Sequence, residues 1–144
     1  MGRFDDRSAI VTGGALGIGG GCARRIAADG GSVLIVDVNE AAGANTVNEI
    51  RAAGGKAEFL AGDVSKESTA KEMVEKAVSS FGRLDLLVQN AYAGADNAGS
   101  AVEVEPENWN NGMGLLVVAL YLGAKYAVPA MEESGADPNF EQAS

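Results

Sequence analysis

The feature that most constrains the fold of this 144-residue chain is a glycine-rich segment that follows a short apolar run near its start. Residues 8–12 read S-A-I-V-T, and residues 12–19 read T-G-G-A-L-G-I-G. Gly13 allows a sharp turn, Gly17 lets the backbone approach a phosphate group, and Gly19 permits close packing of a helix against a strand. A helix that begins here presents unpaired N–H groups and the positive end of its dipole to an anion. The segment therefore predicts a strand, a phosphate-binding turn and a helix, in that order.

An acidic residue at the end of the next apolar run supports this interpretation. Asp37 closes the run S-V-L-I-V-D and stands 20 residues after Gly17, where a carboxylate accepts hydrogen bonds from an adenosine ribose. Because 20 of the 144 residues are glycine, the glycine cluster alone is weak evidence, and a glycine-rich turn with a capping aspartate is the structural alternative. A carboxylate here repels the 2′-phosphate of NADP, and no Arg or Lys lies between Gly13 and Arg24 to attract it. The sequence thus favours NAD over NADP as the cofactor.

The rest of the chain alternates between short apolar runs and longer segments with helical periodicity. The run that ends near Asp37 is continuously apolar and rich in β-branched residues, as expected for a strand buried on both faces of a sheet. Glycines follow several helical segments, as they do at many helix ends. We expect strands at Ser8–Thr12, Ser32–Val38, Ala57–Ala61 and Leu84–Gln89, and helices at Gly17–Ala28, Ala41–Ala53, Lys66–Phe81 and about Glu107–Met131.

This alternation predicts an α/β fold: a Rossmann-like doubly wound parallel sheet, truncated after about four strands, in spatial order 3-2-1-4. Helices should cover both faces, and a ligand should lie between the first and fourth strands, where the strand order reverses. We expect one dinucleotide-binding domain over residues 1–131, with a long loop at Tyr92–Glu105 and Pro106 in the first turn of the last helix. Residues 132–144 hold four acidic residues and no basic one, and we expect them to form a polar C-terminal tail.

Composition excludes several classes of site and partner. The chain has no histidine and a single cysteine, Cys22, so His-based triads, His-ligated metals and four-thiolate zinc sites are excluded. A net charge of -9 repels phosphate backbones and anionic lipid, so we expect no nucleic acid and no membrane among the partners. The uncharged apolar stretch Met113–Ala124 is too short to span a bilayer, and no signal peptide opens the chain. A cytoplasmic protein is the resulting expectation.

Several motifs together resemble the short-chain dehydrogenase/reductase family. They are the glycine pattern that begins at Thr12, the pair Asp63-Val64 after the third predicted strand, the run 87–91 (L-V-Q-N-A) at the fourth, and Trp109 near the start of the long helix. The similarity covers about residues 4–131, and the combination is far more specific than any one motif. The resemblance implies a nicotinamide dinucleotide as cofactor and a small-molecule alcohol or ketone as substrate of the full-length enzymes.

The resemblance also implies roles for individual residues. Asp63 would bond the adenine amino group, Val64 would pack near it, and Asn90 and Ala91 would lie beside the ribose. The family motif there is Asn-Asn-Ala-Gly, whereas this chain has Q-N-A-Y, so that Tyr92 replaces the last glycine. The expected cofactor-binding residues come from the glycine-rich turn and the ends of the next three strands: Gly13, Leu16, Gly17, Ile18, Gly19, Asp37, Asp63, Val64, Asn90 and Ala91.

The catalytic residues of the family have no counterpart here. Family members carry an Asn seven residues after the Trp, where this chain has Leu116, and a later Ser followed by Tyr-x-x-x-Lys. Residues 121–125 read Y-L-G-A-K, but they lie in the long helix, where we expect Tyr121 to be a packed aromatic residue and Lys125 a solvated one. We therefore assign no catalytic residue, and we interpret Cys22 as a buried thiol.

Two hypotheses about function follow. In the first, the chain is the cofactor-binding part of an NAD-dependent oxidoreductase acting on alcohol or carbonyl groups, truncated before its catalytic half and inactive alone. In the second, it is a non-catalytic dinucleotide-binding or interaction module. A methyltransferase fits less well, because its glycine spacing differs. The apolar fourth strand would be a sheet edge, and the long helix has an apolar face, so a homo-oligomer is also expected.

Overall fold

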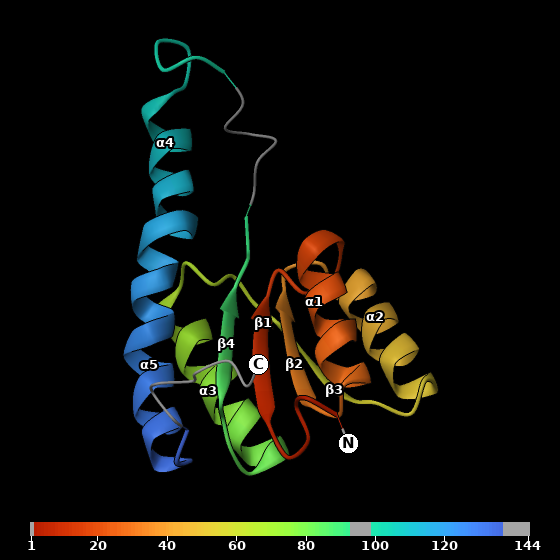
Figure 1. The fold of residues 1–144 in the computed structure, drawn as a ribbon. Coiled ribbons are helices and arrows are strands. Elements are labelled where there is room, and N and C mark those ends of the chain that lie inside the picture. Colours follow the sequence, from red (N-terminus) through yellow and green to blue (C-terminus); the bar gives the residue numbers. More distant parts are fainter. Residues whose placement is uncertain (1, 93–98, 137–144) are drawn as a thin grey trace.

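The computed structural model describes residues 2–92 and 99–136. Four strands form one sheet in the order β3-β2-β1-β4, and all three neighbouring pairs are parallel (Figure 1). The predicted fold class and strand order are therefore confirmed. The strands are β1 (Ser8–Thr12), β2 (Ser32–Asp37), β3 (Lys56–Ala61) and β4 (Leu86–Gln89). The helices are α1 (Gly17–Ala28), α2 (Glu40–Ala52), α3 (Glu67–Phe81), α4 (Pro106–Met113) and α5 (Ala119–Glu133), with a π-helical segment at Gly114–Val118 between the last two.

The register of the sheet brings the carboxyl ends of the strands to one edge. Thr12 at the end of β1 lies opposite Val36 of β2 and Gln89 of β4, and Asp37 lies opposite Ala61 of β3. The residues that follow all four strands are consequently neighbours, although they are up to about 80 positions apart in the sequence. Ligands of open α/β sheets bind at this edge.

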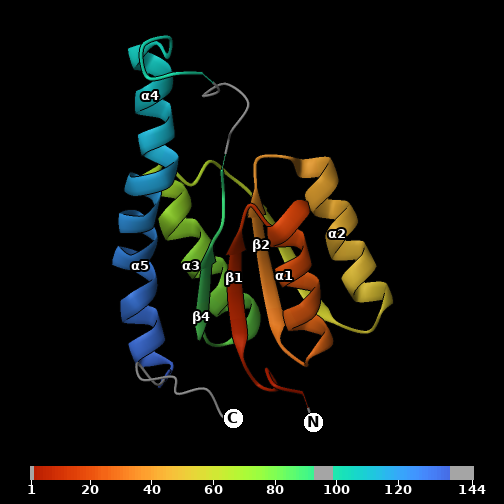
Figure 2. The same cartoon turned by 45° about the horizontal axis from the view of Figure 1, so that its top comes forward.

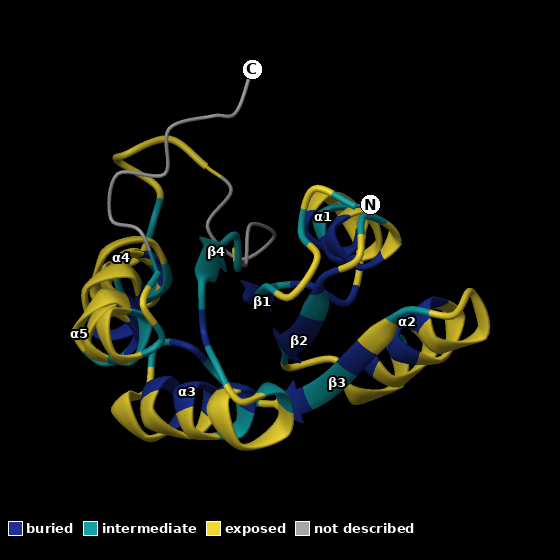
Figure 3. Cartoon of the chain, turned by 60° about the horizontal axis from the view of Figure 1, so that its bottom comes forward, coloured by how far each residue is buried: buried dark blue, intermediate teal, exposed yellow. Residues whose placement is uncertain are grey.

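Helices cover both faces of the sheet, as predicted. Helices α1 and α2 pack on one face, and α3 and α5 pack on the other (Figures 2 and 3). The two central strands are buried between these layers, and Ile10, Val11, Leu34 and Ile35 are fully buried. Successive side chains of β1 and β2 enter opposite clusters, which explains why their sequences are continuously apolar.

The long C-terminal helix differs from the prediction in its middle. Pro106 occupies the first turn, as expected, but a wider turn interrupts the helix at Gly114–Val118, where the N–H of Ala119 bonds the carbonyl of Gly114. Gly112 and Gly114 weaken the α-helical preference here. The pattern of hydrophobic residues did not predict the wider turn, because one added residue in a single turn changes that pattern too little to be detected. The helix then continues to Glu133, two residues beyond the predicted end. Residues 137–144 of the expected tail lie outside the described residues.

By length and composition, the continuous helix Pro106–Glu133 could cross a membrane. The sequence prediction considered only the uncharged stretch Met113–Ala124, whereas the helix has 28 residues. This is weak evidence for a membrane span, because core helices of water-soluble proteins meet the same criterion. In this fold α5 packs against α3 and β4.

Candidate functional site

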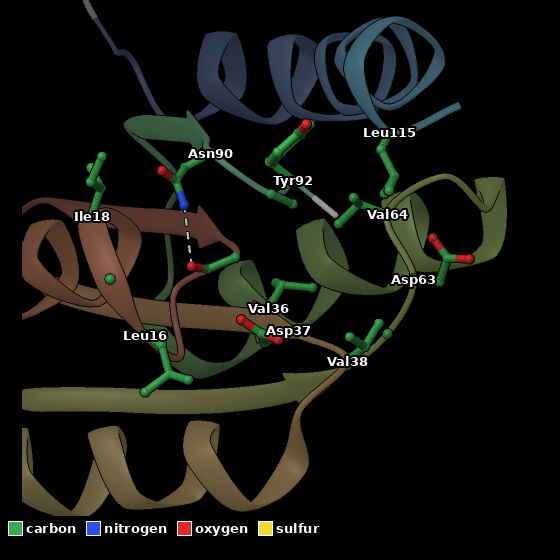
Figure 4. A pocket seen from close by; sticks show the side chains of 14 residues that line it. Leu16, Ile18, Val36, Asp37, Val38, Asp63, Val64, Asn90, Tyr92 and Leu115 are labelled. Atoms are coloured by element: carbon green, nitrogen blue, oxygen red, sulfur yellow. Dashed lines mark hydrogen bonds between the residues drawn. The ribbon is translucent and has the colours of Figure 1, made fainter. Parts of the chain in front are cut away.

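A pocket of about 540 Å³ lies at the carboxyl edge of the sheet (Figure 4). Its walls come from the segments that follow all four strands and from Leu115 in the π-helical segment. Of the residues predicted to bind a cofactor, all except Gly19 line this pocket. They are Gly13, Leu16, Gly17, Ile18, Asp37, Asp63, Val64, Asn90 and Ala91.

The three glycines of the turn have different structural roles. Gly13 has φ +63°, and a Cβ there would stand 2.8 Å from the Cα of Ala91. Gly17 has φ +56°, and no atom lies within 4 Å of the position its Cβ would take, so its open side faces free space. At Gly19 a Cβ would overlap the carbonyl oxygen of Gly13 and stand 2.5 Å from Nδ2 of Asn90. Gly19 thus lets α1 approach the turn closely, as predicted, but it is not part of the pocket wall.

The N-terminus of α1 opens on the same pocket. Leu16 is the N-cap residue, and no described side chain caps the helix there. The first turn contains no acidic residue. Unpaired N–H groups and the dipole make such an end favourable for an anion, and the bare backbone of Gly17 removes the steric obstacle to one.

Asp37 holds the turn in place from the end of β2. Its Oδ2 accepts a hydrogen bond from the N–H of Ala15 at 3.1 Å, and its Oδ1 accepts one from the N–H of Asn39 at 3.0 Å. Each carboxylate oxygen can accept more than one hydrogen bond, so Asp37 keeps capacity for a ligand. The fully buried hydroxyl of Thr46 donates to the carbonyl of Ala15 at 2.7 Å and fixes the same residue from α2. No local sequence pattern indicated this role of Thr46, because its partner lies 31 positions away.

Asn90 has a structural role that the sequence analysis did not predict. Its side-chain amide donates to the carbonyls of Thr12 and Gly13 at 3.3 and 3.2 Å, so it braces the glycine-rich turn. The N–H groups of Asn90 and Ala91 both donate to Oγ1 of Thr12, at 3.1 and 3.2 Å. These bonds fix the segment that leaves β4. Asn90 and Ala91 both line the pocket, and the amide nitrogen of Asn90 already donates hydrogen bonds within the protein.

Asp63 and Val64 lie at the turn that leads from β3 into α3. Oδ1 of Asp63 accepts hydrogen bonds from the N–H and the hydroxyl of Ser65, at 2.9 and 2.7 Å. The N-cap residue of α3 is Lys66, so Asp63 fixes the turn before the helix rather than capping the helix itself. Val64 is 7% exposed and belongs to the core while also lining the pocket.

The structure adds lining residues that were not among the expected cofactor-binding residues: Val36, Val38, Gly62, Tyr92 and Leu115. All of these residues except Leu115 lie at or shortly after the end of a strand, and this position could have indicated that they line the pocket. Leu115 reaches the pocket from the π-helical segment, whereas Leu116, at the family's Asn position, is about half exposed and is not a lining residue.

The Tyr-x-x-x-Lys sequence in α5 lies outside this pocket. Tyr121 is 61% exposed, so within this chain it is not the packed aromatic residue that the sequence predicted. Lys125 is an ion-pair partner rather than a free surface lysine, since its Nζ lies 3.2 Å from Oε1 of Glu67. Glu67 accepts a hydrogen bond from Tyr126 as well, and these two donors lower the pKa of Glu67. The hydrogen bond and charge of Glu67 raise the pKa of Lys125, which therefore stays protonated.

Two other expectations concern Cys22 and metals. Cys22 is only half-buried, packed against the cluster beneath α1, so the prediction of a buried thiol was partly wrong. Within residues 2–92 and 99–136, no group of three His, Cys, Asp or Glu side chains could hold a metal ion.

The sheet order, the glycine-rich turn at the point where that order reverses, and the carboxylate at the end of the neighbouring strand define a Rossmann-like α/β protein. Comparison with known families gives the narrower assignment. The model of the family described as short chain dehydrogenase matches residues 7–137, and the chain belongs to this family.

Similar proteins include dehydrogenases and solved family structures. The chain is 38% identical over 133 residues to a 2,5-dichloro-2,5-cyclohexadiene-1,4-diol dehydrogenase of Sphingobium indicum, covering 92% of this chain and 52% of that protein. A Burkholderia phymatum short chain dehydrogenase/reductase in complex with NAD superimposes with a TM-score of 0.85 at 31% identity, over 91% of this chain and 46% of that one. A metagenomic short-chain oxidoreductase in complex with NADP superimposes with a TM-score of 0.84 at 29% identity, over 92% of this chain and 60% of that one. The chain spans about half the length of the curated relatives it matches.

Proposed function

We propose that this chain is the cofactor-binding part of an oxidoreductase that acts on alcohol or carbonyl groups, and that it binds a nicotinamide dinucleotide in the pocket at the carboxyl edge of its sheet. Membership of the short chain dehydrogenase family favours this function over a non-catalytic interaction module. The observation that carries the proposal is the position of Asp37, which lies in one pocket with the open N-terminus of α1 and bonds the turn that forms it.

The residues of the pocket fit such a group. The N–H groups at the start of α1 and the open side of Gly17 would hold the diphosphate. The Asp37 carboxylate would accept hydrogen bonds from the adenosine ribose, while Asp63 and Val64 would lie along the base. When bound, the nicotinamide ring supplies the hydride acceptor for oxidation of an alcohol.

NAD is the form that this pocket favours. The lining residues include two carboxylates, Asp37 and Asp63, and neither Lys nor Arg is among those the structure describes. The 2′-phosphate of NADP would stand close to Asp37 without a cation to neutralise it, so repulsion lowers its affinity. Titration calorimetry with NAD and NADP tests this proposal. We expect NAD to bind at least tenfold more tightly, and equal affinities would show that Asp37 does not select the cofactor.

We also propose that the 144 residues alone do not turn over substrate. Oxidation of an alcohol requires removal of the hydroxyl proton, and a positioned acid–base group contributes about 10²- to 10⁴-fold to such steps. Tyr121 and Lys125, the pair with matching spacing, lie outside the pocket, and Lys125 is paired with Glu67. An assay of NADH formation over a broad panel of alcohols should give no signal. Turnover that disappears in Tyr121→Phe and Lys125→Ala would contradict this proposal and identify them as catalytic residues.

A further inference from the structure

Tyr92 lies three residues after the end of β4, and the backbone that leads to it is held in place. The two residues before it, Asn90 and Ala91, donate their N–H groups to Oγ1 of Thr12 at 3.1 and 3.2 Å. These bonds tie the segment to the end of the central strand β1. The chain therefore delivers Tyr92 to the carboxyl edge of the sheet from an anchored position.

The side chain of Tyr92 lines the pocket and is 62% exposed. Figure 4 shows it on the same side of the pocket as Val64 and Leu115, opposite Leu16 and Val38. Leu16 and Val38 are also largely exposed, at 61% and 72%. Large apolar side chains that converge on a cavity while exposed to solvent mark a surface for an apolar ligand group.

From this arrangement we propose that Tyr92 is a specificity-determining residue of the pocket, and that its ring packs against the adenine base of the bound nucleotide. The proposal rests on the proposed function, because it assumes that a dinucleotide occupies this pocket. It assigns a role to a residue that stands where the resembled family motif has glycine.

Adenine fits this place better than nicotinamide does. Tyr92 shares its wall with Val64, which follows β3, and Asp37 at the end of β2 is the ribose acceptor. The anion-binding N-terminus of α1 follows β1, on the other side of β2 from β3. A dinucleotide with its diphosphate at α1 and its adenosine ribose at Asp37 therefore extends its adenine toward β3 and Val64. Tyr92 follows β4, on the other side of β1, but its side chain lies on the same side of the pocket as Val64 and Leu115, where the adenine would lie (Figure 4).

Replacement of the ring tests the role, with ADP as the probe because it carries adenine without nicotinamide. Stacking of a base on an aromatic side chain contributes about 5- to 160-fold in affinity by substitution. We expect Tyr92→Leu and Tyr92→Gly to lose a factor in this range for ADP and for NAD alike. Tyr92→Phe keeps the ring and should bind both within about twofold of the unchanged chain. Tyr121→Leu is the matched control, because Tyr121 is equally exposed but lies outside the pocket.

The outcomes separate this inference from the proposed function. If Tyr92→Gly binds ADP as tightly as the unchanged chain, or more tightly, the ring obstructs or ignores the base and the inference is wrong. Nicotinamide mononucleotide affinity that falls in Tyr92→Gly while ADP affinity does not would likewise overturn it. Failure of the unchanged chain to bind both NAD and ADP would instead contradict the proposed function, and the inference with it. Thermal unfolding of each variant shows whether the exposed substitution leaves the fold intact.

Discussion

The carboxylate of Asp37 accepts a hydrogen bond from the backbone N–H of Ala15, at 3.1 Å between Oδ2 and the nitrogen. The residue expected to recognise a ribose therefore also anchors the turn expected to hold the diphosphate. Ligand recognition and the shape of the turn are coupled through one side chain, so substitutions at this position act on both.

The first prediction concerns the two parts of this role. Asp37→Ala removes both the ribose acceptor and the turn anchor, and hydrogen bonds to a charged group contribute about 1.5–3 kcal/mol. We expect NAD affinity to fall by about tenfold or more in calorimetry. Asp37→Asn keeps an oxygen that can accept the hydrogen bond from Ala15 but removes the charge. It should therefore reduce the difference in affinity between NAD and NADP, and it should disturb the turn less than Asp37→Ala does. Glu72→Ala removes an exposed carboxylate on α3 and is the control.

The second prediction compares how alanine substitution at two glycines of α1, Gly19 and Gly21, changes the free energy of unfolding. A Cβ at Gly19 would overlap the carbonyl of Gly13, whereas nothing lies within 4 Å of a Cβ at Gly21. Overpacking a tight contact costs about 1–3 kcal/mol, so Gly19→Ala should lower the free energy of unfolding by that amount. Gly21→Ala should raise it by about 1 kcal/mol, because alanine favours the helix. Urea unfolding measures both, and equal effects would mean that α1 does not require the close approach.

The third prediction is a pH dependence at the opposite edge of the sheet. The side chain of Asp85 is 3% exposed. Burial acts to raise its pKa, but hydrogen bonds from Arg83, the N–H of Ser8 and Arg7 outweigh burial and hold the pKa below its ordinary value of 3.8. A lowered pKa in the folded state stabilises the protein above the unfolded-state pKa, and this stabilisation is lost as the pH falls through the folded-state value.

The variant Asp85→Asn tests this pH dependence. At pH 7 its free energy of unfolding should be about 1.5–3 kcal/mol lower than that of the unchanged chain, because it loses hydrogen bonds to a charged group. The difference from the unchanged chain should shrink as the pH is lowered below about 4. A difference that is constant from pH 7 to pH 3 would show that the Asp85 charge does not contribute to stability. Glu72→Gln is the control, because Glu72 is an exposed carboxylate on α3.

The fourth prediction is self-association through β4. Among the described residues β4 pairs with β1 alone, and Leu86, Leu87 and Val88 are only half-buried. Unpaired apolar edge strands pair with other chains, and an inward-pointing lysine prevents this. We expect light scattering to show a molecular mass that rises with concentration, and Val88→Lys to reduce that rise. Val102→Lys, on a fully exposed residue outside β4, should not. A monodisperse monomer at high concentration would contradict the prediction.

Local patterns determined most of the architecture. The continuous apolar run of β2 predicts burial on both faces, and Leu34 and Ile35 are indeed completely buried in opposite clusters. Gly82 ends α3 in a left-handed conformation, as the sequence indicates. These features depend on residues near one another in the chain. The right-handed crossover rule, together with the Rossmann-like topology that the glycine-rich turn indicates, converts them into a strand order.

Contacts between residues far apart in the sequence could not be predicted from such local patterns. The hydroxyl of Thr46 bonds the carbonyl of Ala15 across 31 positions, and the Asn90 amide braces the turn at Gly13 across 77. The π-helical turn that places Leu115 on the pocket wall is also invisible in hydrophobic periodicity, since one extra residue per turn changes the facing side chains without changing composition.

The strand–helix alternation, the glycine-rich turn and the carboxylate at the end of β2 could be predicted from the sequence, because backbone freedom, side-chain periodicity and charge are properties of neighbouring residues. Which atoms of those residues remain available to a ligand depends on how the chain folds in three dimensions. The fold uses the Asn90 amide to brace the turn, leaves the side of Gly17 open, and brings Tyr92 to the same pocket as Asp37. The physical reason is that hydrogen bonds and cavities depend on distances between segments that the chain order does not specify.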